Sequence, residues 1–301
     1  MRIAVAFLLV CAQAFGWHPV GHKIIAAICY DELSAKTRAK VDALLRAHPD
    51  YAALSANASG NKGRRAFINL AGWPDDIKGD PRFYSDTARN PVATPTLPGF
   101  PDMKRHTDWH YVNFYFSPDN TPFPATPPTP NVLTQMPVVI DGLKGPFAPY
   151  YLGWFEHLVG DIHEPMHNIS RFVAWNKGRN GRPQSDLGGN SVNVDGFTNL
   201  HAVWDDLLGT VDDPDYIDWM ARRLRREFPA EKTPDLDPEH WSHAGFELAK
   251  SEAYKFGAEF GSNDKPFRRT PEYTRNALPV ARRQGALGGR RMAAILTARL
   301  D

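Results

Sequence analysis

Two pairs of histidine and aspartate, each four residues apart, are the most chemically informative feature of this sequence. The pairs are His157 with Asp161 and His201 with Asp205. On a helix, residues four apart project from one face, so each pair can offer an imidazole and a carboxylate to one metal ion. Pro165 ends the first helix, which leaves His167 on a loop that can turn back toward the same site. The alternative is a pair of hydrogen-bonded structural histidines, but two such helices favour a metal site in a helical core.

The first sixteen residues have the pattern of a signal peptide. A charged start at Met1 and Arg2 precedes an apolar run from residue 3 to residue 12, and Ala14 and Gly16 supply small residues at a cleavage site. The apolar run is too short to cross a bilayer. We therefore expect residues 1–16 to be removed, the mature chain to begin at Trp17, and the protein to be secreted or periplasmic with no membrane anchor.

Charge and cysteine content restrict the possible partners and cross-links. The formal net charge of the 301-residue chain is +1, which argues against a strongly basic surface that holds long duplexes by their phosphates. Arginine clusters at 222–226, 282–283 and 290–291 are interpreted as solvated helix faces, since apolar residues alternate with them at helical spacing. Cys29 would be the one cysteine of the mature chain, so no intramolecular disulfide is expected, and a buried position is favoured.

Hydrophobic periodicity predicts an all-α fold, a single mainly helical domain over residues 17–301 with long loops and one small β-hairpin. Helices are expected at 20–48, 64–71, 137–164 with a break at Gly145 and Pro146, 199–210, 214–228, 238–260 and 271–300, the last capped by Thr270. Prolines between residues 79 and 136 predict a long loop, interrupted at 106–116. A surface loop is expected at 176–190 and the hairpin at 188–197.

Four further residues could join the two histidine-aspartate pairs. The α-amino group of a mature Trp17 has an ordinary pKa of about 7.7 to 8.0, so it can lose its proton near neutral pH and bind zinc. His22 lies five residues later, within reach through the first helical turn. Asp75 follows Trp-Pro, and His110 lies in a short segment whose alternation puts His110 and Val112 on one side. Asp75 and His110 would ordinarily be surface or core residues, and the resemblance described next favours them as ligands.

Taken in order, nine positions resemble the secreted zinc-dependent single-strand nucleases and 3′-nucleotidases of the mung bean nuclease (S-one/P-one) type. These positions are Trp17, His22, Asp75, His110, His157, Asp161, His167, His201 and Asp205. The resemblance covers essentially the whole mature chain and implies three zinc ions in an all-α fold related to zinc phospholipase C. It assigns Asp75, His110, His157 and Asp161 to the first ion, and His167, His201 and Asp205 to the second. The Trp17 amine and carbonyl, His22 and the bridging Asp161 take the third.

The same resemblance implies a reaction and a set of substrates. Two zinc ions bridged by Asp161 would activate water, the remaining ion would stabilise the leaving 3′ oxygen, and Lys78 would neutralise charge on the phosphate. Asp75, Lys78 and Asp161 are thus the implied catalytic residues. The implied activity is hydrolysis of single-stranded DNA and RNA to 5′-mononucleotides, together with 3′-nucleotidase activity, by a monomer.

Base recognition is implied to come from Tyr111, which matches a stacking position, and from Asn113, which matches a position that hydrogen-bonds the base. Eukaryotic members often carry aspartate at the second position, and they also carry disulfides that this chain lacks. Stacking needs an unpaired base, so single strands are expected to be preferred. A core role for Tyr111 is the alternative.

Two other functions remain possible from the sequence. A zinc-dependent phospholipase C has a similar amino-terminal tryptophan and trinuclear site, but a choline headgroup would require acidic and aromatic groups where this chain has Tyr111 and Asn113. A non-enzymatic zinc-binding protein would bind metal without hydrolysing phosphodiesters. Hydrolysis of single strands, of phosphatidylcholine or of neither distinguishes the three.

Overall fold

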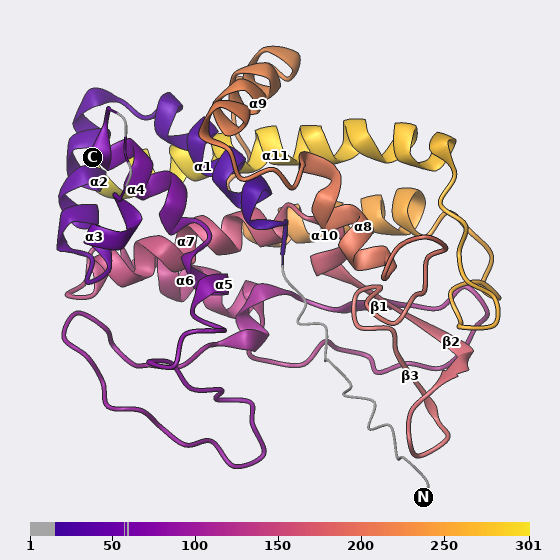
Figure 1. Cartoon of the computed structure of the whole chain (residues 1–301). Coiled ribbons are helices and arrows are strands. Elements are labelled where there is room, and N and C mark those ends of the chain that lie inside the picture. Colours follow the sequence, from indigo (N-terminus) through magenta and orange to yellow (C-terminus); the bar gives the residue numbers. More distant parts are fainter. Residues whose placement is uncertain (1–15, 57, 59) are drawn as a thin grey trace, which may run out of the picture.

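The computed structural model describes residue 16 to residue 301 except residues 57 and 59, and it is mainly helical (Figure 1). The α-helices are α1 (Pro19–Glu32), α2 (Ala35–Ala47), α3 (Tyr51–Leu54), α4 (Lys62–Leu70), α5 (Trp73–Asp76), α6 (Val132–Gly142), α7 (Ala148–Ile162), α8 (Leu200–Asp205), α9 (Pro214–Glu227), α10 (Pro238–Leu248) and α11 (Pro271–Leu300). The predicted all-α class is confirmed. Residues 1–15 of the expected signal peptide lie outside the described residues. Among the helices described, none combines the length and the apolar character needed to cross a bilayer.

Three short strands form one small sheet in the order β1 (Phe114–Phe116), β2 (Ile169–Lys177) and β3 (Pro183–Ser185). β1 runs parallel to β2, with Phe114 opposite Ile169, and β3 runs antiparallel to β2. The hairpin is therefore β2–β3, and the prediction of a hairpin at 188–197 is wrong, as is that of a continuous loop at 176–190. Gly188 and Gly189 turn the chain at positive φ. The backbone of Asn193 then forms hydrogen bonds with Gly261 and Phe267 instead of with the other strand of the expected hairpin.

The helices pack around two hydrophobic cores. The larger core joins α1 to α4, α7, α9 and α11, and it buries Cys29 as expected. The smaller core lies between the sheet, α8 and the first turns of α11. Ile162 at the end of α7 belongs to the larger core and Met166 to the smaller one. The predicted ligands Asp161 and His167 flank the segment between these two residues and therefore lie where the cores meet.

The expected single helix at 20–48 is two helices in the structure. α1 ends at Glu32, and Leu33 and Ser34 adopt extended backbone angles. The Ser34 hydroxyl accepts a hydrogen bond from the Thr37 backbone N–H at 3.0 Å and so caps α2. An N-cap serine satisfies an amide that would otherwise lack a partner, which makes a new helix start favourable inside an uninterrupted apolar pattern.

Other helix ends also differ from the prediction. α6 begins at Val132 rather than at 137, since Asn131 and Thr134 form a reciprocal capping box. α10 ends at Leu248, and a single wider turn at Ala249–Ala253 replaces the continuation expected to residue 260. α8 is followed by a 3₁₀ turn at Asp206–Leu208. The break after Gly142, the helix at 62–70 and the Thr270 cap of α11 agree with expectation.

Between α5 and α6 the chain forms the expected long loop, in which His106 joins separate segments. The His106 Nε2 atom lies 3.1 Å from Asp102 Oδ1, its Nδ1 lies 3.6 Å from Asp86 Oδ2, and its ring stacks on Trp109 at 3.7 Å between centroids. Burial lowers the pKa of His106, but Asp102 and Asp86 outweigh burial and raise the pKa above 6.5. We call the contacts of His106 with Asp86, Asp102 and Trp109 the His106 clasp. Trp109 precedes the predicted ligand His110, so the clasp holds the segment that carries this ligand.

We expect the His106 clasp to give a pH-dependent stability. Because the folded-state pKa of His106 exceeds the unfolded value of 6.5, its contribution is complete below that pH and is lost as the pH rises through the folded pKa. His106→Asn, which tolerates the left-handed backbone at φ 46°, should lower Tm by about 2–4 °C at pH 5.5 and by less at pH 9. Thermal melts of both proteins measure this, and an equal loss at both pH values would contradict it.

Candidate metal centre

The nine predicted ligand residues are buried, none of them more than 7 % exposed. They come from the start of α1, from α5, from the 3₁₀ turn Thr107–His110, from α7, from the 3₁₀ turn Pro165–Asn168 and from α8, which converge in the middle of the molecule (Figure 1). Potential ligand atoms within 4.8 Å of one another form three groups. These groups are Asp75, His110 and His157; His22, His157 and Asp161; and Glu164, His167, His201 and Asp205.

Asp161, in the last turn of α7, faces two of these groups at once. Its Oδ2 atom lies 3.0 Å from His110 Nδ1 and 3.2 Å from His157 Nε2, one helical turn earlier. Its Oδ1 atom lies 3.4 Å from His22 Nε2. Burial would raise the pKa of Asp161, but His157 and His167 outweigh it and hold the pKa well below the usual range. Asp161 is therefore an ionised carboxylate with one oxygen available to each side.

Asp75 completes the group around His110 and His157. Its Oδ1 atom lies 3.6 Å from His157 Nε2 and 3.9 Å from His110 Nδ1. The Lys78 ammonium is buried beside it, 2.5 Å from the same oxygen. Although burial opposes ionisation, Lys78 and the two histidines depress the pKa of Asp75. Burial also lowers the pKa of His110 to about 3, so its imidazole is neutral and able to donate an electron pair.

The remaining group contains a residue that the sequence analysis missed, Glu164. The His167 and His201 Nε2 atoms lie 3.2 Å apart, and Asp205 Oδ2 lies 3.6 Å from His201 Nε2. Glu164 is fully buried, and one carboxylate oxygen accepts a hydrogen bond from the His167 backbone N–H. Burial raises the pKa of Asp205, and the facing Glu164 raises it further. Two carboxylates in one dry group require either a proton or a cation between them.

Backbone carbonyls aim three of the histidines. The Nδ1 atom of His157 lies 2.8 Å from the Ala71 carbonyl oxygen, that of His167 lies 2.6 Å from the His110 oxygen, and that of His201 lies 2.7 Å from the Gly188 oxygen. An Nδ1–H that donates to a carbonyl fixes the tautomer and leaves Nε2 as the electron-pair donor. Each ring is thus oriented with Nε2 toward its group, as metal-binding histidines are.

Several buried polar atoms at these groups have no hydrogen-bond partner among the described residues. They are His22 Nδ1 and Nε2, Asp75 Oδ2, His110 Nε2, Asp161 Oδ1, Glu164 Oε1 and Asp205 Oδ1. Buried polar atoms are nearly always satisfied in folded proteins, so a concentration of exceptions at one place indicates a ligand. Imidazole and carboxylate donors without thiolate suit zinc. The residues present therefore fit a set of bound cations.

The chain enters this centre through Gly16 and Trp17. Trp17 is fully buried, and the His18 backbone N–H donates to the Asp205 carbonyl oxygen at 3.1 Å. A Cβ atom added to Gly16 would lie 1.9 Å from Asp161 Oδ1 and 2.8 Å from His22 Nε2. The residue before Trp17 thus lies directly against two predicted ligands of the third ion.

Tyr111 and Asn113 lie beside the second group. Together with Met166, Leu187, Gly188, Asn190 and His201, they line a cavity of about 160 Å³. The Tyr111 hydroxyl donates to Asp108 Oδ1 at 3.1 Å, and its side chain is only partly buried. The alternation expected around His110 is present, since His110 and Val112 are buried whereas Tyr111 and Asn113 are partly exposed. Tyr111 is therefore at a cavity wall rather than in the core.

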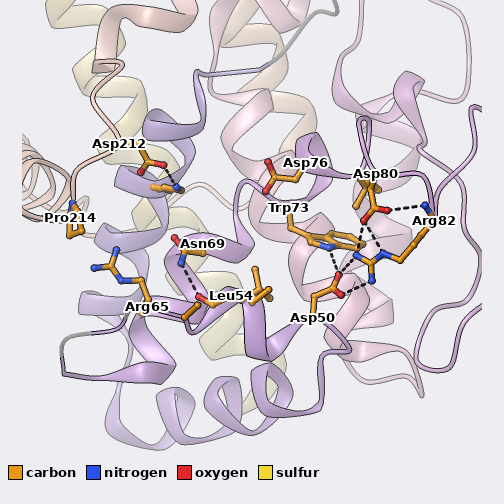
Figure 2. A pocket seen from close by; sticks show the side chains of 14 residues that line it. Asp50, Leu54, Arg65, Asn69, Trp73, Asp76, Asp80, Arg82, Asp212 and Pro214 are labelled. Carbon is orange, nitrogen blue, oxygen red and sulfur yellow. Dashed lines mark hydrogen bonds and ion pairs between the residues drawn. The ribbon is translucent and has the colours of Figure 1, made fainter.

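A larger cavity of about 520 Å³ lies beside α5, and residues in its wall hold that helix (Figure 2). In its wall, Asp50 accepts a hydrogen bond from Trp73 Nε1 at 2.9 Å and pairs with Arg82 at 2.7 Å. Trp73 begins α5 two residues before Asp75, so this network holds the helix that carries the ligand. Asp76 lines this cavity, whereas Asp75 does not.

The fold and the site together define a class, an all-α protein with clustered histidine and carboxylate groups that could hold several metal ions. Comparison with known families makes this specific. Residues 17–301 match the family model described as S1/P1 Nuclease. The chain belongs to this family, which places it among the hydrolytic nucleases.

Individual relatives have low sequence identity to this chain, but their names agree with the family match. The chain is 24% identical to Endonuclease 5 of Arabidopsis thaliana over 98% of this chain and 96% of that protein. It is 25% identical to Endonuclease 3 of the same plant over 69% of this chain, and 24% identical to Nuclease S1 of Aspergillus oryzae over 68%. These two alignments span 61% and 58% of the relatives' own lengths.

Proposed function

We propose that this protein hydrolyses single-stranded DNA and RNA to 5′-mononucleotides and also removes the phosphate of 3′-nucleotides. The observation that carries the proposal is the two-sided Asp161 carboxylate, which lies within 3.4 Å of histidines from three separate parts of the chain. Membership of the S1/P1 nuclease family supports it. We also propose that residues 1–16 are removed and that the protein is exported to the periplasm or outside the cell. The mature protein, residues 17–301, would be a monomer.

Three zinc ions are the proposed cofactors. Asp75, His110, His157 and Asp161 would hold the first, and the Trp17 amine and carbonyl with His22 and Asp161 would hold the third. His167, His201 and Asp205 would hold the second, to which we add Glu164 as a fourth ligand on account of its unpartnered buried oxygen. When bound, zinc supplies Lewis-acid polarisation of the phosphate and lowers the pKa of water.

The protein's own charged groups prepare the site for a phosphate. Lys78 pairs with Asp75 and places a buried ammonium group beside the residues that would hold the first ion. A buried ammonium is poorly screened, so it stabilises charge that develops on the phosphate more strongly than it would in water. Asp161 stays ionised at neutral pH because of its depressed pKa, which keeps both oxygens available as ligands.

Tyr111 and Asn113 are the proposed base-binding residues. Their cavity adjoins His201, so a base stacked on Tyr111 would have its phosphate near the second group. The hydrogen bond to Asp108 fixes the Tyr111 ring, which reduces the entropy lost on stacking. A paired base cannot enter such a cavity, and the Asn113 amide can donate to and accept from a base edge.

Metal analysis and product identification on the mature protein test this function. We expect about three zinc ions per chain, release of 5′-mononucleotides from single strands, phosphate release from 3′-AMP, and much slower cleavage of duplex. Chelation should abolish turnover and zinc should restore it. Hydrolysis of phosphatidylcholine alone would refute the proposal in favour of a phospholipase, and metal binding without hydrolysis would refute any enzymatic function. Unchanged zinc affinity in Glu164→Gln would remove Glu164 from the ligand set.

A further inference from the structure

The outer face of α9 carries an aromatic and basic stripe that the metal centre does not use. Tyr216, Trp219, Arg223 and Arg226 recur at spacings of three, four and three, with Arg222 beside them, so their side chains follow one side of the helix. The opposite side packs against α1 through Ile217, Met220, Ala221 and Leu224. We call Tyr216, Trp219, Arg222, Arg223 and Arg226 the α9 stripe.

Trp219 gives this stripe a flat apolar surface. Trp219 is 45% exposed, so part of its indole ring is accessible to a partner. The Tyr216 ring lies 5.9 Å away, and the Arg223 guanidinium lies 5.5 Å from the indole centroid. These neighbours support the indole from the helix side and leave part of it open to a stacking partner.

Unbalanced positive charge adjoins the indole. Arg222 and Arg226 are exposed and have no ion pair or hydrogen bond with any residue that the structure describes. With Arg225 they line a hollow of about 380 Å³, whose acidic residue, Glu32, already accepts a hydrogen bond from Arg225 at 2.8 Å.

The acidic residues of α9 do not cancel this charge. Asp218 is paired with Arg64 at 2.8 Å, and Glu227 is paired with Arg223 at 3.3 Å. Asp215 is the remaining acid and lies in the first turn, away from the carboxyl-terminal arginines. The carboxyl-terminal half of the stripe is therefore complementary to a polyanion.

The stripe starts close to the metal centre. The Tyr216 hydroxyl donates to the Leu208 carbonyl at 2.9 Å, three residues after the predicted ligand Asp205. Lys23, which follows the predicted ligand His22, pairs with Asp212 at 2.6 Å just before α9. Figure 1 shows α9 projecting from the helical body beyond α1. A strand that leaves the centre on this side can run along the exposed stripe.

We propose that the α9 stripe is a second binding surface for single-stranded nucleic acid. An unpaired base stacks on Trp219, and Arg222 and Arg226 bind the adjoining phosphates. This combination of aromatic rings and arginines is the means by which proteins hold single strands without reading their sequence. The proposal rests on the proposed nuclease function, and it predicts that long strands are bound more tightly than mononucleotides.

Steady-state kinetics on a twenty-nucleotide single strand and on 3′-AMP test the proposal. Trp219→Ala should raise KM for the strand about fivefold or more, with kcat and the turnover of 3′-AMP unchanged. Arg222→Gln with Arg226→Gln should also raise KM, and should reduce the slope of log KM against log salt by about 1.4, or about 0.7 for each lost phosphate contact. The control, Arg46→Gln with Arg275→Gln, removes two exposed arginines on α2 and α11 and should leave KM unchanged.

Any other result contradicts either the α9 stripe as a binding surface, the stacking on Trp219, or the proposed nuclease function. An unchanged KM for the strand in the stripe variants, with 3′-AMP still hydrolysed, overturns the surface alone. An equal rise in the control shows a net-charge effect and also overturns it. Trp219→Phe keeps a ring and should retain most of the affinity, so a loss equal to that of Trp219→Ala overturns stacking. Failure of the unmodified protein to hydrolyse either substrate overturns the proposed nuclease function instead.

Discussion

A protein that keeps one extra residue before Trp17 is expected to lose at least about 100-fold in phosphodiester hydrolysis while remaining folded. In the structure, Gly16 lies so close to the proposed third site that an added Cβ would be 1.9 Å from Asp161 Oδ1. Two effects follow from retaining it. The Trp17 nitrogen becomes an amide, which has no basic electron pair for a metal, and the preceding residue occupies space between Asp161 and His22.

Zinc stoichiometry and rate, measured on the mature and the Gly-extended protein, check this prediction. We expect the extended protein to bind about one zinc fewer, and to have a similar Tm after chelation, since the buried helical packing does not involve residue 16. A protease site placed before Trp17 provides the control, because cleavage should restore both zinc and rate. An extended protein with full activity and three zinc ions would rule out the terminal amine as a ligand.

The sequence predicted those parts of the centre that depend on side-chain type and helical spacing. Four-residue spacing on α7 and α8 was enough to bring His157 to Asp161 and His201 to Asp205. Asp75 and His110 come from segments with no such periodicity, and only the resemblance to a known family pointed to them. His110 contacts His157 and Asp161, which are 47 and 51 residues away along the chain, and Asp75 also lies beside His157. At such separations local patterns carry no information.

Other features could not be predicted from the sequence. Some depend on backbone atoms, and others depend on whether a capping residue or the helical apolar pattern decides the local structure. The carbonyl oxygens of Ala71, His110 and Gly188 aim the histidines, and a carbonyl has no residue type to recognise. Ser34 ends one helix and starts another within an unbroken apolar pattern. Glu164 lies between Asp161 and His167 in the sequence, but no local pattern shows that its side chain is buried against His167, His201 and Asp205.

Asp161→Asn is expected to lower turnover by about 10³-fold or more and to decrease the thermal stability gained from zinc. An asparagine has one side-chain oxygen and no charge. It therefore cannot place one carboxylate oxygen beside His22 and the other beside His110 and His157. With Asp161 the buried carboxylate stays ionised, since its pKa is held well below the usual range. His157→Ala should have a comparable effect, because its Nε2 atom faces Asp75 as well as Asp161.

The matched control is Asp76→Asn, which makes the same carboxylate-to-amide change on α5 at a residue that lines the cavity of about 520 Å³ (Figure 2). It should retain activity within about twofold, because Asp76 is exposed and belongs to none of the three ligand groups, although it follows Asp75 in the chain. Rates on 3′-AMP, zinc content and Tm with and without chelator are measured for all three proteins. If Asp161→Asn keeps full zinc content and its rate, the bridging carboxylate is not part of the mechanism. If it loses zinc and rate together while Asp76→Asn loses neither, hydrolysis depends on the carboxylate at position 161 and not on local negative charge.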